Sequence, residues 1–207
     1  MRTKTLILTA VLSAAGLATS LAQTPVYSQN AVGYVNKTFA TGFTMVANPL
    51  KTSNDTVGSL FPSVPLFVNF YKWNGASFDI ATFTPGGWDL PNITLKPGEG
   101  GFINTDTAFT NTFVGEVSQG SLSHAVPAGF SIQASEVPQA GTLDALGLVL
   151  NTFDNVYKWN GSSYTIYTVL PGGGWDPAVP SVEVAESFFV NAATATTWNR
   201  TFSVNTP

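Results

Sequence analysis

The sequence contains no cysteine, and this absence excludes several kinds of site. Without thiols the chain has neither disulfides nor cysteine redox chemistry, and a zinc site built on cysteine is excluded as well. The absence also excludes a bacterial precursor that is lipid-anchored through a cysteine after its signal segment. A chain of 207 residues can nevertheless bury enough apolar surface to be stable without such crosslinks.

Histidine occurs only once, as His124, which argues against a histidine-rich metal site. A serine triad would need this histidine, but the sequence has no G-x-S-x-G nucleophile elbow. We expect His124 to lie in an exposed loop. The glycine runs lack the lysine and the following helix of a phosphate-binding loop. We therefore predict no catalytic residues, no metal site and no cofactor.

Charged residues are also scarce, at 10% of the chain. Two of the eight basic residues, Arg2 and Lys4, belong to an N-terminal export segment. Its removal leaves 8 − 2 = 6 basic against 12 acidic residues, a formal charge of −6. Nucleic acid is an unfavourable partner for a chain with this balance.

The N-terminal 22 residues have the pattern of a secretory signal peptide. The basic start is followed by an apolar run from Leu6 to Leu17 and by the small-residue cleavage site Ser20-Leu21-Ala22. No later segment is long and apolar enough to span a membrane. We expect a protein that is secreted or held at the cell surface after cleavage near Ala22, with no membrane span in the mature chain.

The pentapeptide YKWNG occurs at residues 71–75 and again at 157–161, 86 residues later. Asn-Gly favours a hairpin turn in which both central residues have positive φ, so each copy predicts a hairpin. Other segments recur at similar spacing. They are Gly42-Phe43-Thr44-Met45 with Gly129-Phe130-Ser131-Ile132, Pro85-Gly86-Gly87-Trp88-Asp89 with Pro171-Gly172-Gly173-Gly174-Trp175-Asp176, and Gly101-Phe102-Ile103-Asn104 with Phe188-Phe189-Val190-Asn191.

These correspondences predict an all-β protein made of two homologous repeats of about 85 residues. The expected boundaries are 1–22 for the signal peptide, 23–112 for the first repeat with an N-terminal strand, and 113–207 for the second repeat with a closing strand. Each repeat should contain one short helical turn, at 55–61 and at 142–147. We expect the repeats to pack as one pseudo-twofold unit, sandwich-like or barrel-like.

Several segments resemble a group of secreted, two-repeat, β-rich bacterial proteins that are numerous in Verrucomicrobia-like genomes and have no assigned function. The segments that carry this resemblance are Tyr27-Ser28-Gln29-Asn30-Ala31-Val32-Gly33-Tyr34-Val35, Ala47-Asn48-Pro49-Leu50, Pro97-Gly98-Glu99-Gly100-Gly101-Phe102, Thr112-Phe113-Val114-Gly115-Glu116-Val117 and Trp198-Asn199-Arg200-Thr201-Phe202-Ser203-Val204. The resemblance implies an exported β-rich protein and brings no catalytic residues with it. The chain departs from the pattern at Val184-Ala185-Glu186-Ser187, where a Gly-Glu turn is expected.

Four tryptophans occupy matching places beside the predicted turns: Trp73, Trp159, Trp88 and Trp175. A flat aromatic ring at a hairpin rim can stack on the C–H face of a sugar, which makes these residues candidate ligand-binding groups. The alternative is that they fill the protein's own core, since tryptophan is usually largely buried.

Carboxylates recur in the same way, as Asp89 with Asp176 and Glu99 with Glu186. Paired carboxylates can hydrolyse glycosides, but an acid and a base need different environments, and a duplication supplies the same residue twice. We expect the two aspartates to form turns and the two glutamates to be solvated. A calcium site at Asp79 and Asp89 has no EF-hand spacing to support it.

The sequence therefore favours a non-enzymatic, exported structural or adhesion protein of the bacterial envelope or extracellular matrix. The alternative is a carbohydrate-binding module that uses the repeated tryptophans, and a glycoside hydrolase comes third. Expected partners are extracellular polysaccharide or envelope proteins. The sequence does not indicate an oligomeric state.

Overall fold

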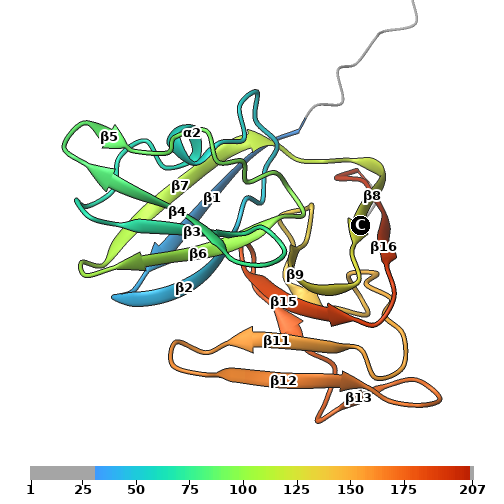
Figure 1. Ribbon diagram of the computed structural model, residues 1–207. Coiled ribbons are helices and arrows are strands. Elements are labelled where there is room, and N and C mark those ends of the chain that lie inside the picture. The colour runs from blue at the N-terminus through green and yellow to red at the C-terminus, as the bar shows by residue number, and fades with distance from the viewer. Residues whose placement is uncertain (1–30, 206–207) are drawn as a thin grey trace, which may run out of the picture. The chain divides into compact units, whose positions relative to one another are not determined.

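The computed structural model describes residues 31–205, and the predicted signal peptide lies outside these residues. Among the described residues, strands dominate and the one helix is α2 (Val57–Leu60) (Figure 1). The predicted all-β class is confirmed. That helix is too short to cross a membrane, as is any helix in this part of the chain.

Two antiparallel five-stranded sheets form the framework. The first sheet has the order β2 (Gly42–Ala47), β6 (Gly100–Thr105), β3 (Asn69–Trp73), β4 (Phe78–Thr84) and β5 (Gly87–Trp88). The second has the order β9 (Gly129–Ala134), β15 (Ser187–Ala192), β11 (Asn155–Trp159), β12 (Tyr164–Val169) and β13 (Trp175–Asp176). When the five strands of each sheet are counted in chain order, both sheets have the spatial order first, fifth, second, third, fourth.

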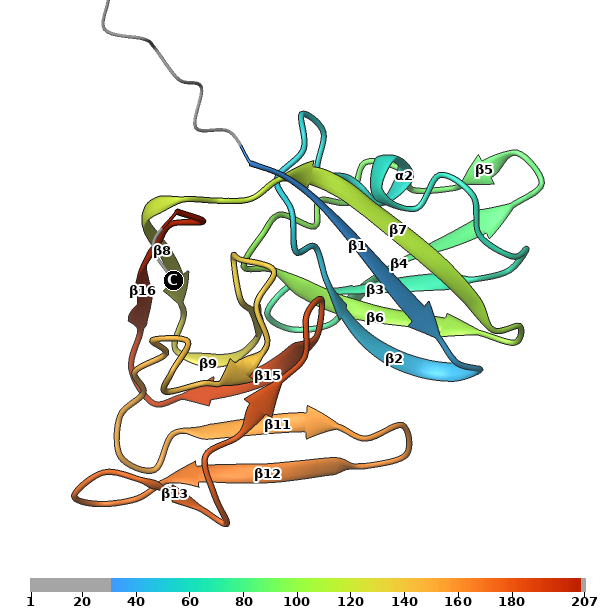
Figure 2. The same cartoon turned by 180° about the vertical axis from the view of Figure 1, so that it is seen from behind.

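Each sheet is accompanied by a two-stranded antiparallel ribbon. One ribbon pairs β1 (Val32–Phe39) with β7 (Phe109–Glu116), and the other pairs β8 (Gly120–Val126) with β16 (Thr196–Phe202). Figure 2 shows β1 and β7 running side by side across one face of the first sheet. A short additional pair joins β10 (Gly141–Thr142) to β14 (Ser181–Val182).

The apolar side chains between ribbon and sheet form a core in each half. Phe39 of β1 and Phe113 of β7 pack with Phe61 and Phe70 in the first core. In the second core, Trp198 of β16 packs with a buried group from the second sheet. That group includes Val156, Phe188 and Val190.

A third apolar layer lies between the two sheets. Successive residues of a strand point to opposite faces, so Phe102 turns away from the first core while Ile103 turns into it. Phe189 and Val190 of β15 divide in the same way between this layer and the second core. Both faces of each sheet are therefore covered by apolar contacts, and the central strands carry almost unbroken runs of buried residues.

Both predicted hairpins are confirmed, but their turn is not the two-residue type that Asn-Gly favours. Trp73 pairs with Phe78, so the loop has four residues, and only Gly75 has positive φ. The side-chain oxygen of Asn74 accepts hydrogen bonds from the backbone of Ala76 and Ser77, at 3.1 and 2.9 Å. An asparagine that bonds its own loop replaces the tighter turn.

The helical turn predicted at 55–61 is confirmed as α2, whereas the second one, at 142–147, is wrong. Thr142 is already paired to Ser181 in the β10–β14 ladder. The residues after Thr142 form a turn with isolated backbone hydrogen bonds, such as the one from Leu146 N to Thr142 O at 2.9 Å. This pairing does not account for the missing helix, because Thr56 pairs with Thr94 in the same way directly before α2.

The two sheets approach most closely at Gly100 in β6. A Cβ at this position would lie 2.3 Å from the Cβ of Ser187 in the second sheet and 2.5 Å from Ile132. Backbone hydrogen bonds join the sheets nearby, from Ala47 N to Ala185 O at 3.1 Å and from Ala134 N to Gly98 O at 3.0 Å.

Gly100→Ala should therefore force the sheets apart and lower the free energy of unfolding by about 1–3 kcal/mol, the range seen for overpacked cores. Gly86→Ala is the matched control, because the nearest atom to its new Cβ is 3.8 Å away. Urea denaturation of both variants tests this. Equal stability of the two would contradict the close contact at Gly100.

Candidate functional site

Trp73 and Trp159 lie at the ends of β3 and β11, where each sheet meets the other. The indole N–H of Trp73 donates to the carbonyl of Phe130 in the second sheet, at 2.9 Å. The indole N–H of Trp159 donates to the carbonyl of Phe43 in the first sheet, also at 2.9 Å. Each ring also packs edge-on against an aromatic residue of the opposite sheet, Trp73 on Phe189 and Trp159 on Phe102. Both rings are half-buried.

The other two predicted tryptophans lie elsewhere. Trp88 is buried in the first core, packs against Phe83 and donates to the carbonyl of Phe61 at 2.8 Å. Trp175 packs against the second core and donates to the side chain of Asp144 at 2.9 Å. Of the four candidates, the structure brings Trp73 and Trp159 to the junction of the sheets.

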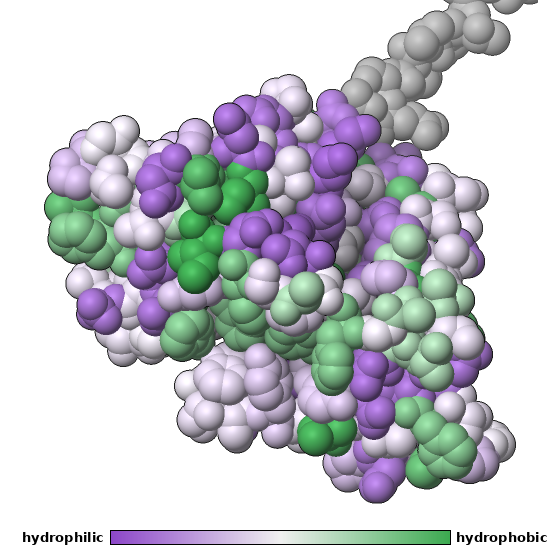
Figure 3. Space-filling model, in the orientation of Figure 1, coloured by the Kyte–Doolittle hydropathy of each residue, from purple (hydrophilic) through white to green (hydrophobic). Residues whose placement is uncertain are grey.

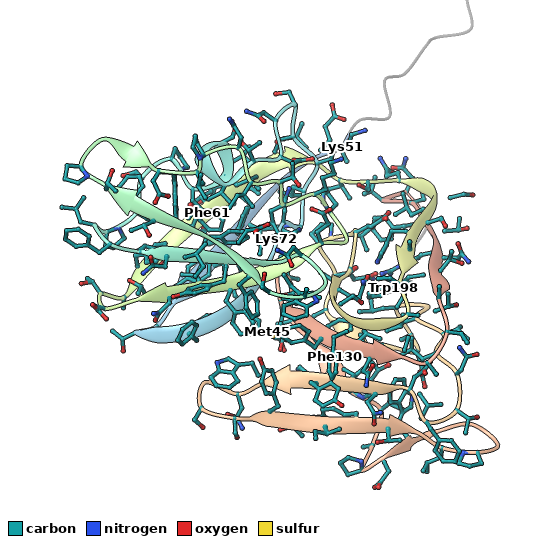
Figure 4. The ribbon with its side chains drawn as sticks, viewed as in Figure 1. Met45, Lys51, Phe61, Lys72, Phe130 and Trp198 are labelled. Carbon is teal, nitrogen blue, oxygen red and sulfur yellow. The ribbon has the colours of Figure 1, made fainter. Side chains whose placement is uncertain are left out.

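A cleft of about 630 Å³ lies beside Trp73, and we call it the Trp73 cleft. Its wall combines the ring of Trp73 and the exposed side chain of Phe130 with polar groups. Those polar groups include Lys72, Glu99, His124, Ser131 and Gln133. Figure 4 shows Lys72 and Phe130 in the region where the two sheets meet.

Lys72 and Glu99 form an ion pair in this cleft, at 2.9 Å. The same carboxylate oxygen of Glu99 accepts the backbone N–H of Lys96 at 2.9 Å. Glu99 therefore both closes its own turn and orients the ammonium group. The sequence predicts a solvated role for Glu99, whereas its carboxylate closes a turn and pairs with Lys72.

His124 does not lie in an exposed loop, so that expectation is wrong. It belongs to β8, opposite Trp198, and is half-buried. Its Nδ1 lies 2.9 Å from a carboxylate oxygen of Glu136. Burial lowers the pKa of His124, and the nearby carboxylates of Glu136 and Glu99 oppose that effect without reversing it. The neutral ring with its proton on Nδ1, donating to Glu136, is consistent with that direction.

A second cleft, of about 480 Å³, lies beside Trp159, and we call it the Trp159 cleft. Lys158 and Glu186 form an ion pair there, at 3.1 Å, and Glu186 accepts the backbone N–H of Glu183 at 2.8 Å. Lys158 also donates to the carbonyl of Ser181. Burial lowers the pKa of Lys37 in the same wall, against the attraction of Glu186 and Glu183.

The predicted carboxylates are held by separate partners. Asp89 accepts the backbone N–H of Thr82 at 2.7 Å and stabilises the β4–β5 turn. Asp79 accepts from the side chain of Asn74 at 3.0 Å. Asp176 lies in the short strand β13 and is exposed. Within residues 31–205, no cluster of three or more histidine, cysteine or acidic side chains has the geometry to hold a metal ion.

Sequence reasoning missed a third hollow, of about 330 Å³, which we call the aromatic cleft. It is lined by Trp73, Phe130, Tyr157, Tyr164 and Phe189, and it shares Trp73 and Phe130 with the Trp73 cleft. The recurrence of Gly42-Phe43 as Gly129-Phe130 was the available signal. It did not reveal that Phe130 is about half exposed, at 47%.

The titration of His124 should make stability depend on pH. Because the folded protein favours the neutral ring, the unfolded chain binds more protons between the lowered folded pKa and the usual value of 6.5. Stability should therefore fall as the pH is lowered through this window. Each unit of pKa lowering corresponds to about 1.4 kcal/mol. For a chain of this size, 1.4 kcal/mol corresponds to roughly 3–6 °C in melting temperature.

Melting temperatures of the wild type and of His124→Gln between pH 7.5 and 5.5 measure this effect. His124→Gln should flatten the dependence, and Ala125→Ser on the outer face of β8 should retain it. His124 is the only histidine of the chain. Identical slopes for wild type and His124→Gln would contradict the assignment.

Comparison with other proteins adds no assignment to these clefts. No protein-family model, no curated protein and no solved structure matches this chain significantly. The function of the site is therefore argued below from its own residues.

Proposed function

We propose that this chain is a non-enzymatic, exported surface protein, built from two homologous repeats and acting in adhesion or surface structure. The observation that carries the proposal is the matched pair of clefts at the junction of two sheets with the same strand order. The contacts between the sheets are reciprocal, since each tryptophan donates to the opposite edge strand. A pseudo-twofold relation between the repeats accounts for this reciprocity.

The charges in the two clefts support a binding role over a catalytic one. Lys72 with Glu99 and Lys158 with Glu186 form ion pairs of nearly equal length, at 2.9 and 3.1 Å. Each glutamate also caps a turn. Acid and base catalysis needs two groups in different environments, whereas these two pairs are held alike.

The surface supports export and adhesion as well. Figure 3 shows hydrophilic and hydrophobic residues interspersed over the face it presents. The outer face of the β1–β7 ribbon carries Thr38 and Thr110, joined at 3.0 Å, and Asn36 and Thr112, joined at 2.7 Å. These four exposed side chains are uncharged and carry hydrogen-bonding groups that a polar partner surface can contact.

Fractionation of the native cells tests export and surface location. The mature protein should be found in the envelope or the medium, and its N-terminus should begin near Gln23 after cleavage. A cytoplasmic marker enzyme is the control for lysis. Recovery of the full-length chain with that marker would overturn the proposal.

We propose carbohydrate binding as a second candidate function, carried by the composition of the Trp73 cleft. A sugar ring has an apolar C–H face and an edge of hydroxyl groups. The rings of Trp73 and Phe130 offer aromatic surface for the first, and Lys72, Glu99 and Gln133 offer hydrogen-bonding groups for the second.

Titration with cellohexaose, chitohexaose and xylohexaose tests this second function. Binding should change the tryptophan fluorescence of the wild type, and Trp73→Phe should remove a large part of that change. Trp175→Phe is the matched control, because Trp175 lines neither the Trp73 cleft nor the Trp159 cleft. The second candidate fails when none of the three sugars binds at millimolar concentration.

A further inference from the structure

The two clefts are built from the same parts at corresponding places. Each is bordered by the end of a YKWNG strand in one sheet and by the edge strand of the other sheet. The corresponding residues are Lys72 and Lys158, Trp73 and Trp159, Asn74 and Asn160, Gly75 and Gly161, Glu99 and Glu186, and Phe130 and Phe43. Both clefts also have room for a sugar ring, at about 630 and 480 Å³.

We propose that the protein is bivalent and that each cleft binds one stretch of a neutral polysaccharide, so that a single chain can crosslink two strands. This inference rests on the carbohydrate-binding function proposed above. Two sites on one compact unit can hold two strands at the same time, which a single site cannot do.

The charges of the clefts select a neutral ligand. In the Trp159 cleft, Lys37 and Lys158 face Glu183 and Glu186, so the two signs balance. In the Trp73 cleft, Lys72 is already paired with Glu99, which leaves Lys96 as the one further lysine of the wall. A strongly anionic or cationic chain would have to displace these partners, whereas hydroxyl groups can both donate to the carboxylates and accept from the ammonium groups.

The aromatic side chains that enter the clefts are preorganised. The carbonyl groups of Phe43 and Phe130 hold the two indole rings, while their own side chains stay 41% and 47% exposed. Each cleft therefore presents a fixed tryptophan beside an exposed phenylalanine. Little side-chain freedom is lost when a sugar stacks there.

The two sites should differ in strength. The Trp73 cleft continues past Trp73 and Phe130 into the aromatic cleft, where Tyr157 and Tyr164 add further rings. A ligand of several sugar units can therefore reach the additional rings of the aromatic cleft, whereas a single sugar unit contacts Trp73 and Phe130 only. We expect the Trp73 cleft to be the tighter site for longer oligosaccharides.

Phe130→Ala and Phe43→Ala test the two sites separately. Each change removes an exposed ring from one cleft and keeps the backbone carbonyl that holds the tryptophan, so both variants should fold. Phe153→Ala is the control, since Phe153 is 67% exposed and lines neither cleft. Circular dichroism and melting temperature verify the fold of all three.

Calorimetric titration with whichever of cellohexaose, chitohexaose or xylohexaose binds gives the stoichiometry. Two sugars per chain are expected for the wild type and for Phe153→Ala. Each cleft variant should weaken one site by about 2- to 13-fold, because losing one stacked ring costs about 0.5–1.5 kcal/mol. The wild type should also aggregate the corresponding long polysaccharide, and both cleft variants should do so less.

One sugar per chain, affected by only one of the two variants, would overturn bivalency and leave carbohydrate binding intact. The absence of binding by all three sugars would overturn the carbohydrate function itself, and bivalency with it. Two sites that neither variant weakens would place the ligand outside these clefts and would also overturn the proposal.

Discussion

The aromatic layer between the two sheets is the constraint on which the rest of the structure depends. Met45 and Phe102 from the first sheet meet Ile132 and Phe189 from the second, and the half-buried rings around them extend the layer. Both sheets also pack against a ribbon on their other side. Each sheet must therefore be apolar on both faces, which is why β6 and β15 carry consecutive buried residues.

The clefts are a geometric consequence of this layer. The sheets touch where Gly100 meets Ser187, and the two clefts are bordered by the ends of β3 and β11. Trp73 and Trp159 stand there. Each indole is anchored to the opposite sheet by its N–H, so the ring that joins the sheets also forms a wall of the cleft.

The turn before β6 contributes both to the contact between the sheets and to the wall of the Trp73 cleft. Gly98 has positive φ and accepts the backbone N–H of Ala134, and Glu99 closes the turn while it pairs with Lys72. In the corresponding turn, Ala185 adopts positive φ in place of glycine. The sequence departure there keeps the turn, because Ala185 accepts the matching bond from Ala47 and packs in the first core.

The sequence by itself determined the all-β class, the two hairpins and the helix α2, because alternation of apolar residues and Asn-Gly turns act within a few residues of the chain. It also determined the matching positions of the tryptophans. Only the tertiary structure decided that Trp88 is buried in a core, that Trp73 and Trp159 bridge the sheets, that residues 142–147 lack a helix and that His124 lies in a strand. Those outcomes depend on partners far away in the chain, such as Phe130 for Trp73 and Trp198 for His124. Local patterns carry no information about which distant residue a side chain will meet.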